Sequence, residues 1–326
     1  MERKGNIFMK RLHVSKEESG QKLEKFIRKS FKELPLSYIY KLFRKKDVKV
    51  NGKRESKDYV VQEGDIVDAY IDSSFDVGNE NVGYKKVKYD LDIVYEDENV
   101  LFVNKKEGVL VHEGDGGNDV NTLNNQVVSY LIDKGEYDPS IKAFIPSPAH
   151  RLDRNTSGII MYGKNIESLQ CLFDLLKSHD NISKYYLTLV PGHITKRGII
   201  EDKLYKDEKK KMVYVSSKGL EAKSIYRPIK SNDDYSLLEV ELLTGRTHQI
   251  RVHLSYHNMP IIGDSKYGDF KLNKEFENKY GLSHQFLCSY KLYFKNIEGK
   301  LSYLSNREFK IELSKDKKKI IDDLFD

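Results

Sequence analysis

Strand-like segments separated by turn residues fill residues 90–326, and they constrain the fold of this chain more than any other feature. Four such runs are 100–103, 184–190, 236–242 and 286–294. Turn residues such as those at 297–300 separate successive runs, which is typical of strands that pair antiparallel. The clearest helix is expected at 166–177, where one face carries Leu169, Leu172, Phe173 and Leu176. We therefore expect an α+β fold, with a large domain at 90–326 that is built on a mixed, mainly antiparallel sheet.

Residues 10–72 have the pattern of a separate small module. A first helix is indicated by apolar residues on one face, Leu23, Phe26, Ile27 and Phe31. A second helix is expected to begin after Ser37, its N-cap, and a strand then runs into an Asn51-Gly52 turn. This order of two short helices and a basic hairpin resembles the S4 RNA-binding domain, which implies a small α+β unit that binds RNA by its shape and backbone.

Positive charge is concentrated in the same module. Residues 10–57 hold 16 Lys and Arg against 6 Asp and Glu, an excess larger than the net charge of +6 of the whole chain. The remainder is therefore net acidic, and a polyanion would be drawn to the N-terminal part. Arg44, Lys45, Lys46 and Lys53 are the expected phosphate contacts, although a merely solubilising surface is the alternative reading of these charges.

Residues 73–89 contain few aliphatic side chains and are expected to be a linker. No apolar run approaches the roughly 20 residues that cross a bilayer, and the N-terminus lacks the apolar core of a signal peptide. Cys171 and Cys288 are the only cysteines, too few for a disulfide framework or a cysteine zinc site. These features predict a cytoplasmic protein, with a monomer as the default.

A dense polar segment, His150 to Gly158, leads into the apolar run Ile159-Ile160-Met161. It places the carboxylate of Asp153 between the guanidinium groups of Arg151 and Arg154, and nearby positive charge keeps a carboxylate ionised. Such a group can act as a nucleophile, a metal ligand or a structural anchor, and the segment alone leaves these open.

Two further segments carry candidate site residues. In residues 243–254, Thr247 is expected to cap a helix that ends near Asn258, with His248 and Arg251 on one face. A cation on that helix is the partner that a buried carboxylate requires. In residues 184–192, strand alternation puts Tyr186 and Thr188 on the same face, where a tyrosine offers a flat surface for a base or simply packs within a sheet.

These three segments, in this order, resemble the RluA-type RNA pseudouridine synthases. The central motif His-Arg-Leu-Asp-x-x-Thr-Ser-Gly is present at 150–158, and Leu-x-Thr-Gly-Arg-Thr-His-Gln-Ile-Arg-Val-His at 242–253 is followed by Gly263-Asp264 and Tyr267-Gly268. Residues 104–112 resemble the opening motif, except that Lys106 stands where proline is usual. With the S4-like module in front, the likeness covers about residues 10–312 and implies the branch that modifies large-subunit ribosomal RNA.

The resemblance also implies roles for single residues. Asp153 occupies the position of the catalytic aspartate, Arg251 that of its paired arginine, and Tyr186 that of the tyrosine that stacks on the target base. Arg151 occupies the position of the arginine that enters the RNA stack when the uridine is flipped out. His150, Thr156 and His248 are further expected substrate contacts within the motifs.

The implied reaction breaks the bond between C1′ and N1 of uridine, turns the base, and rejoins it through C5. The base is detached and rejoined to the same sugar without any redox change, so no metal, ATP or other cofactor is expected. A metal-dependent nuclease with His150, Asp153, His248 and His253 as ligands is one alternative. A non-catalytic RNA-binding or ribosome-assembly factor and a tRNA-directed pseudouridine synthase are two others.

Overall fold

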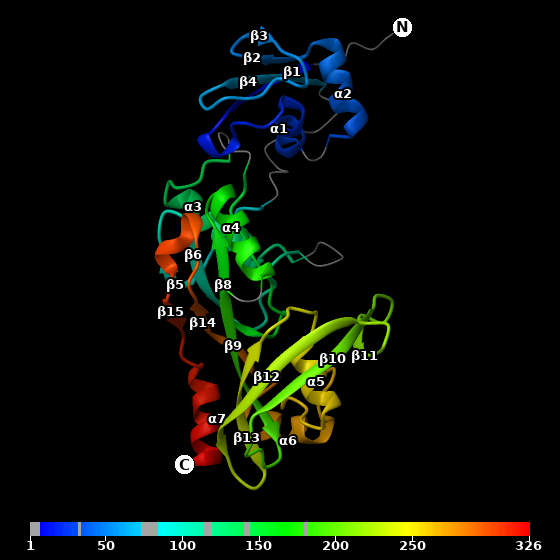
Figure 1. Cartoon of the computed structure of the whole chain (residues 1–326), viewed down its shortest axis with the longest axis vertical. Helices are drawn as coiled ribbons and strands as arrows, with labels where there is room; N and C mark the ends of the chain where they lie inside the picture. Colours follow the sequence, from blue (N-terminus) through cyan, green and yellow to red (C-terminus); the bar gives the residue numbers. More distant parts are fainter. Residues whose placement is uncertain (1–6, 32–33, 73–83, 114–118, 140–143, 179–180) are drawn as a thin grey trace.

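The protein, seen here as a computed structural model, is described at residues 7–31, 34–72, 84–113, 119–139, 144–178 and 181–326. Its strands form two separate sheets, and the smaller sheet with its helices lies at one end of the long axis (Figure 1). Most of the expected linker, 73–83, lies outside the described residues, and 84–91 contain neither helix nor strand. No helix in the described part of the chain combines the length and apolar character needed to cross a membrane.

The smaller sheet has the order β1 (Ile7–His13), β4 (Ile66–Asp72), β2 (Val48–Val50) and β3 (Lys53–Arg54), with every pair antiparallel. The predicted turn between β2 and β3 is confirmed, because Asn51 and Gly52 both have positive φ. Helices α1 (Leu23–Ser30) and α2 (Leu36–Lys45) share one apolar core with this sheet. The expected N-cap Ser37 is wrong by two positions, since Pro35 precedes the first turn of α2.

The larger sheet is mixed and mainly antiparallel, as predicted. Its order is β11 (Met212–Val215), β10 (Gly198–Asp207), β12 (Leu220–Ser231), β13 (Tyr235–Leu242), β9 (Ile182–Pro191), β14 (Leu287–Phe294), β8 (Ser157–Gly163), β6 (Val100–Lys105) and β5 (Asp92–Glu96). The short strands β7 (Ser147–Pro148) and β15 (Glu308–Lys310) pair with β8 and β14. Among the described strands, only β8 and β14 run parallel.

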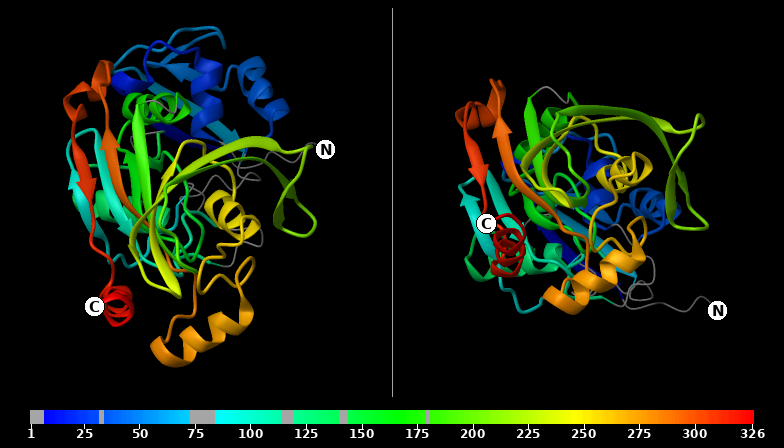
Figure 2. Two further views of the ribbon diagram at one scale, coloured as in Figure 1. Left: turned by 60° about the horizontal axis from the view of Figure 1, so that its bottom comes forward. Right: turned by 90° about the horizontal axis from the view of Figure 1, so that it is seen from below.

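Helices cover both faces of the larger sheet (Figure 2). At the β6–β8 end, α4 (Ile166–Lys177) packs on one face and α3 (Leu123–Asp133) on the other. At the β9–β13 end, α5 (Gln249–Tyr256) packs on one face, while α6 (Phe270–Tyr280) and α7 (Lys315–Phe325) share a core on the other. Two short 3-10 helices, Lys16–Glu18 and Gly299–Leu304, complete the fold.

Helix α4 has the predicted bounds, and three of the four residues predicted for its buried face, Leu169, Leu172 and Leu176, pack in the core. Leu172 and Leu175 are buried against β6 and β8, whereas Phe173 is 43% exposed. The buried face is therefore rotated slightly from the predicted one, with Leu175 in the place expected for Phe173. The small unit touches this region, since Glu18 Oε1 accepts a hydrogen bond of 3.2 Å from the backbone N–H of Phe144.

Gly158 makes the parallel contact between β8 and β14 close. Its φ is +124°, and a Cβ added there would lie 2.3 Å from the backbone oxygen of Ser289. No side chain fits between the two strands at this position. The glycine of the His150–Gly158 segment is therefore a packing requirement that fixes where the preceding loop enters the sheet.

We predict that Gly158→Ala lowers the free energy of unfolding by more than about 3 kcal/mol, because strand separation adds to backbone strain. Gly192→Ala is the matched control, since Gly192 has a φ of +95° and no atom within 4 Å of an added Cβ. Only the strain of roughly 1–2 kcal/mol is expected there. Equal losses in urea denaturation of the two variants would contradict the close-contact explanation.

Candidate active site

Asp153 lies in the loop that joins β7 to β8, and the loop is held from within. The backbone N–H of Thr156 donates to the Asp153 carbonyl oxygen at 3.1 Å, and the Thr156 hydroxyl accepts from Gln285 Nε2 at 3.2 Å. The buried ammonium of Lys105 donates to the carbonyl oxygens of Arg154, Lys106 and Val109 at 2.8–2.9 Å. Burial lowers the pKa of Lys105 to about 8. These bonds tie the loop to the end of β6 and set the position of Asp153.

Arg251, on α5, joins two carboxylates. Its Nε and Nη2 donate to the two oxygens of Asp264 at 2.7 and 2.8 Å, and its Nη1 donates to Asp153 Oδ2 at 2.8 Å. The Asp264 side chain is 0% exposed and that of Asp153 is 28% exposed. Asp153 Oδ1 has no hydrogen bond from any residue that the structure describes. One carboxylate thus anchors the guanidinium, and the other keeps an oxygen available to a ligand.

The charges of Arg251 and Asp264 stabilise each other. Burial alone would raise the pKa of Asp264, but the hydrogen bonds and charge of Arg251 outweigh it, and the pKa lies below its usual range. Burial alone would lower the pKa of Arg251, but the hydrogen bond and charge of Asp264 outweigh it and raise the pKa. Arg251 therefore remains charged beside Asp153.

His248 and Tyr267 line the same cluster. The Tyr267 ring lies 5.2 Å from the Arg251 guanidinium, and its hydroxyl accepts from the backbone N–H of Val213 at 2.9 Å. His248 Nδ1 lies 2.8 Å from that hydroxyl, and Nε2 lies 3.9 Å from Asp153 Oδ2. Donation by Tyr267 to Nδ1 leaves the ring proton on Nε2, facing the carboxylate. Burial is the main cause that lowers the pKa of His248, which favours this neutral form.

The start of α5 differs from the expected one. His248, and not Thr247, is the N-cap residue, and it adopts a left-handed conformation with φ of +52°. The helix ends at Tyr256, close to the predicted end. Ile250 and Leu254, four residues apart on this helix, are both buried. The unusual backbone turns the imidazole toward Asp153, a geometry that residue spacing on a regular helix does not give.

Tyr186 comes from β9, on the face that α5 covers. It is buried, and burial raises its pKa to about 12, with the charge of Asp153 adding to the rise. Its phenol is thus neutral at ordinary pH. Thr188 is buried on the same strand, as the alternation predicted.

The two arginines that flank Asp153 in sequence are not its partners. Arg151 is exposed and makes no bond with a described residue, while Arg154 bonds to the Gly108 carbonyl and to Asp119. The expectation of a carboxylate held between these two groups is wrong, because the ion pair comes from α5. His150 accepts a hydrogen bond from the Met161 N–H at 3.3 Å, and burial lowers its pKa to about 3.

The basic residues of the small unit lie apart from this cluster. Arg44 and Lys45 form the last turn of α2, Lys46 is its left-handed C-cap, and Lys53 lies in β3. All four side chains are exposed. The expected phosphate contacts therefore lie in the unit that contains the smaller sheet. The unit that contains the larger sheet carries the cluster of Asp153, Arg251, His248 and Tyr186.

The residues of the metal-site alternative do not form a ligand group. His253 is buried with Nδ1 3.1 Å from the Ser224 hydroxyl, and Asp153 is occupied by Arg251. Within the described ranges, no three His, Cys, Asp or Glu residues are grouped so that they could hold a metal ion. The nuclease reading loses its geometric basis.

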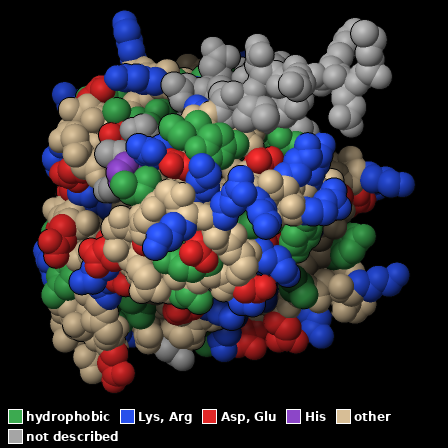
Figure 3. Space-filling view, turned by 90° about the horizontal axis from the view of Figure 1, so that it is seen from above, with side chains coloured by type: hydrophobic (Ala, Val, Ile, Leu, Met, Phe, Trp, Pro, Cys, Tyr) green, Lys and Arg blue, Asp and Glu red, His purple; other side chains and the backbone are tan. Residues whose placement is uncertain are grey.

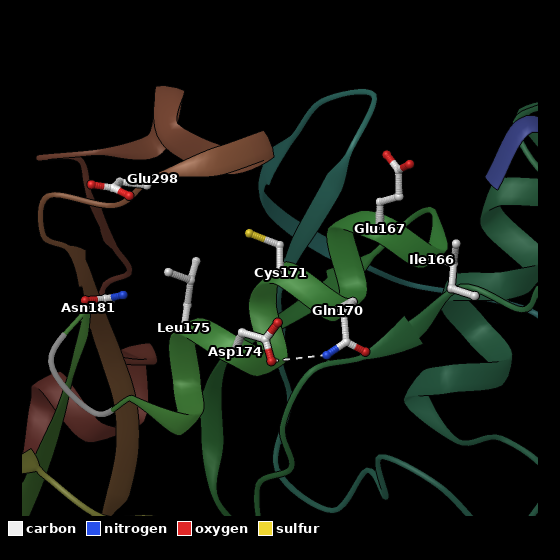
Figure 4. A pocket seen from close by; sticks show the side chains of 8 residues that line it. All are labelled: Ile166, Glu167, Gln170, Cys171, Asp174, Leu175, Asn181 and Glu298. Carbon is white, nitrogen blue, oxygen red and sulfur yellow. Dashed lines mark hydrogen bonds between the residues drawn. The ribbon is translucent and has the colours of Figure 1, made fainter. Parts of the chain in front are cut away.

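A cavity of about 680 Å³ lies elsewhere, along α4 (Figure 4). Its lining includes Glu167, Asp174 and Glu298, together with Cys171 and Leu175. Acidic walls do not suit a polyanion, and none of the three motif segments contributes to it. We therefore centre the candidate active site on Asp153.

Three residues of the site were not singled out from the sequence as site residues. Asp264 and Tyr267 stand in the quoted motif downstream of α5, and Lys105 stands in the opening motif. Their presence within motif segments was the available signal. Nothing in residue spacing shows that a loop after α5 returns to clamp Arg251.

The chain is similar to known RNA pseudouridine synthases. The sequence model described as RNA pseudouridylate synthase matches residues 99–256. An uncharacterized RNA pseudouridine synthase of Mycoplasma capricolum subsp. capricolum is 34% identical over 92% of this chain and 96% of its own length. The ribosomal large subunit pseudouridine synthase C of Haemophilus influenzae is 32% identical over 89% of this chain and 88% of its own.

A solved structure supports the fold. Human RNA pseudouridylate synthase domain containing 4 superposes with a TM-score of 0.53 at 21% sequence identity, covering 68% of this chain and 88% of its own. At this identity the likeness concerns the fold alone.

We predict that Asp264→Ala destabilises the protein by about 3–5 kcal/mol, because it leaves a buried guanidinium without its anchor. Asp153→Asn should cost less than about 1 kcal/mol, since that carboxylate is partly exposed and Arg251 keeps both bonds to Asp264. Urea denaturation at pH 7 measures both. A larger loss for Asp153→Asn than for Asp264→Ala would reverse the roles assigned to the two carboxylates.

Proposed function

Because this chain belongs to the RNA pseudouridine synthase family, we propose that it converts specific uridines of large-subunit ribosomal RNA to pseudouridine. The observation that carries the proposal is the Asp153 carboxylate, held by Arg251 at 2.8 Å through one oxygen and unbonded by described residues at the other. The name of the Haemophilus influenzae relative supports a ribosomal RNA target. We propose the cytoplasm as the place of action.

The target base must leave its stack before it reaches Asp153, at a cost of a few kcal/mol. Arg151 is exposed next to the catalytic loop, and we assign it to the space that the flipped base leaves. His150 and Thr156 are engaged in bonds within and around the loop. For these two we propose positioning of Asp153 in place of the substrate contacts expected from the motif.

Asp153 acts in this proposal as an ionised nucleophile or base. Arg251 holds the carboxylate in one orientation, and Asp264 balances the guanidinium so that Asp153 keeps its own negative charge for the reaction. Bound RNA would cover the exposed part of Asp153 and strengthen its electrostatic effect. Uridine and pseudouridine are isomers, so the overall reaction needs no oxidant, reductant or water.

Tyr186 supports the detached base. Its neutral phenol stands on the strand beside α5, where an aromatic face can stack on uracil and keep it in place while it turns. Retention of the base favours rejoining through C5 over its escape.

The small unit of residues 10–72 is proposed to be an S4-like RNA-binding module. Figure 3 looks onto the end of the molecule that carries this unit and shows many Lys and Arg side chains there, with Asp and Glu side chains among them. Arg44, Lys45 and Lys46 end α2, and Lys53 lies across the Asn51-Gly52 turn. Such exposed cations suit phosphate contacts that orient an RNA without reading its sequence.

Pseudouridine mapping of total RNA from cells with and without the gene tests the proposed function. A ribosomal site that loses modification in the deletion and regains it with the wild-type gene supports the proposal. Modification lost from tRNA instead would redirect the target, and no loss at any site would favour a non-catalytic RNA-binding role.

Asp153→Asn should abolish pseudouridine formation, because an amide is neither a nucleophile nor a base at this position. RNA affinity should stay within about twofold of wild type, since the phosphate contacts are unchanged. Asp119→Asn, a neighbour that pairs with Arg154, is the control and should keep wild-type turnover. Pseudouridine made by Asp153→Asn would remove Asp153 from its catalytic role.

The triple change of Arg44, Lys45 and Lys46 to Ala should weaken RNA binding and reduce the slope of log K against log salt by about 2–3. The matched control changes Lys315, Lys318 and Lys319 to Ala on α7, at the other end of the molecule in Figure 1. An equal loss in the control would show that only net charge matters. Unchanged binding in the first variant would place the RNA contact elsewhere.

A further inference from the structure

Lys184 is a buried residue whose cation has no partner among the described residues. It is 8% exposed, and its ammonium makes no hydrogen bond or ion pair with any residue in the described ranges. Two other lysines in those ranges are as well buried, and both are satisfied: Lys105 donates to three carbonyl oxygens, and Lys317 pairs with Glu107. A folded protein rarely leaves such a group unpaired without a reason.

The lysine lies within the candidate active site. On β9, Ile182 packs with the cluster under α4 and Tyr186 with the cluster under α5. Lys184 lies between these two residues on the same face of β9, two positions before Tyr186. A Cβ added at Gly245 would lie 3.9 Å from its Nζ, so the ammonium sits beside the loop that leads to His248.

The loop of Asp153 is also near this ammonium. After burial, the charge of Lys184 is the next cause that lowers the pKa of His150, three residues before Asp153. Lys184 is therefore beside the loop that leads to His248 and shares a strand face with Tyr186, and its charge acts on the loop of Asp153. It belongs to the site by position, although neither the mechanism above nor the ion pairs of the site use it.

The Lys184 side chain is largely removed from water, and an ammonium in such a position without a counterion is stabilised when an anion reaches it. Burial is the cause that lowers the pKa of Lys184, and no carboxylate compensates for it. Uracil is neutral before its glycosidic bond breaks, whereas every nucleotide of an RNA strand brings one phosphate charge. A phosphodiester is thus the anion that an RNA substrate supplies in the ground state.

We infer that Lys184 binds a backbone phosphate of the RNA strand at the target uridine, and so draws the flipped nucleotide in beside Tyr186. The inference rests on the proposed function and extends it, because it adds a phosphate contact inside the site to those on the small unit. The burial cost is offset only when RNA is bound, which favours the flipped state over the stacked one.

The test compares Lys184→Met and Lys184→Arg with wild type on a synthetic RNA hairpin that carries the mapped uridine. In Lys184→Met, hairpin affinity should fall roughly tenfold and the salt slope by about 0.7–0.9, the share of one phosphate. Lys184→Arg should restore most of the affinity. Lys184→Met should be at least as stable to urea as wild type, since an unpaired buried charge is removed.

A hairpin with neutral methylphosphonate linkages on both sides of the uridine completes the cycle. The affinity that wild type loses on this RNA should equal the affinity that Lys184→Met loses on the natural hairpin. Lys184→Met on the modified hairpin should bind no more weakly than either single change does. Lys291→Met is the control, because Lys291 pairs with Glu239 and contacts Tyr185 on the opposite strand face. Its salt slope should equal that of wild type.

Additive losses, an unchanged salt slope, or a loss confined to turnover would overturn the phosphate assignment. So would a fall in stability of Lys184→Met, which is the mark of a purely structural lysine. Wild-type turnover on the natural hairpin separates failure of this inference from failure of the proposed function. If wild type is active and Lys184→Met binds the hairpin equally well, only the inference is refuted. An inactive wild type refutes the proposed function, and the phosphate assignment with it.

Discussion

The guanidinium of Arg251 is the interaction on which the site depends. It joins helix α5 and the loop after α5 to the loop before β8, which is distant in sequence. Asp264 is buried and accepts hydrogen bonds from Arg251 through both carboxylate oxygens. This one residue therefore both neutralises and orients the guanidinium. Asp153 then receives a single N–H, and the three groups together keep one net negative charge where the substrate arrives.

Support for this arrangement comes from bonds that involve no charge pair. Lys105 binds three carbonyl oxygens around the loop, Thr156 binds Gln285, and Gly158 allows the chain to pass against Ser289. Motif residues around Asp153 thus serve mainly to place it. The loop is held by satisfied backbone groups, and in the proposed reaction a fixed carboxylate lowers the entropy that must be overcome.

The sequence predicted the mixed, mainly antiparallel sheet and the bounds of α4, because strand runs and a long helical stretch leave strong periodic signals. The pairing of Asp153 with Arg251 followed from resemblance, not from spacing. Asp264 contacts Arg251 from the loop after α5, His248 is a left-handed N-cap, and Lys184 has no partner within the described ranges. These features arise from tertiary contacts, which local patterns do not encode.

The parallel pairing of β8 with β14 sets when the site can form. Ser157 pairs with Cys288, and more than a third of the chain lies between them. During synthesis, which proceeds from the N-terminus, the loop of Asp153 emerges long before the strand that secures it. The small N-terminal unit can fold early, while the reactive loop waits for β14. A nascent chain therefore completes its small N-terminal unit before the loop of Asp153 is fixed in place.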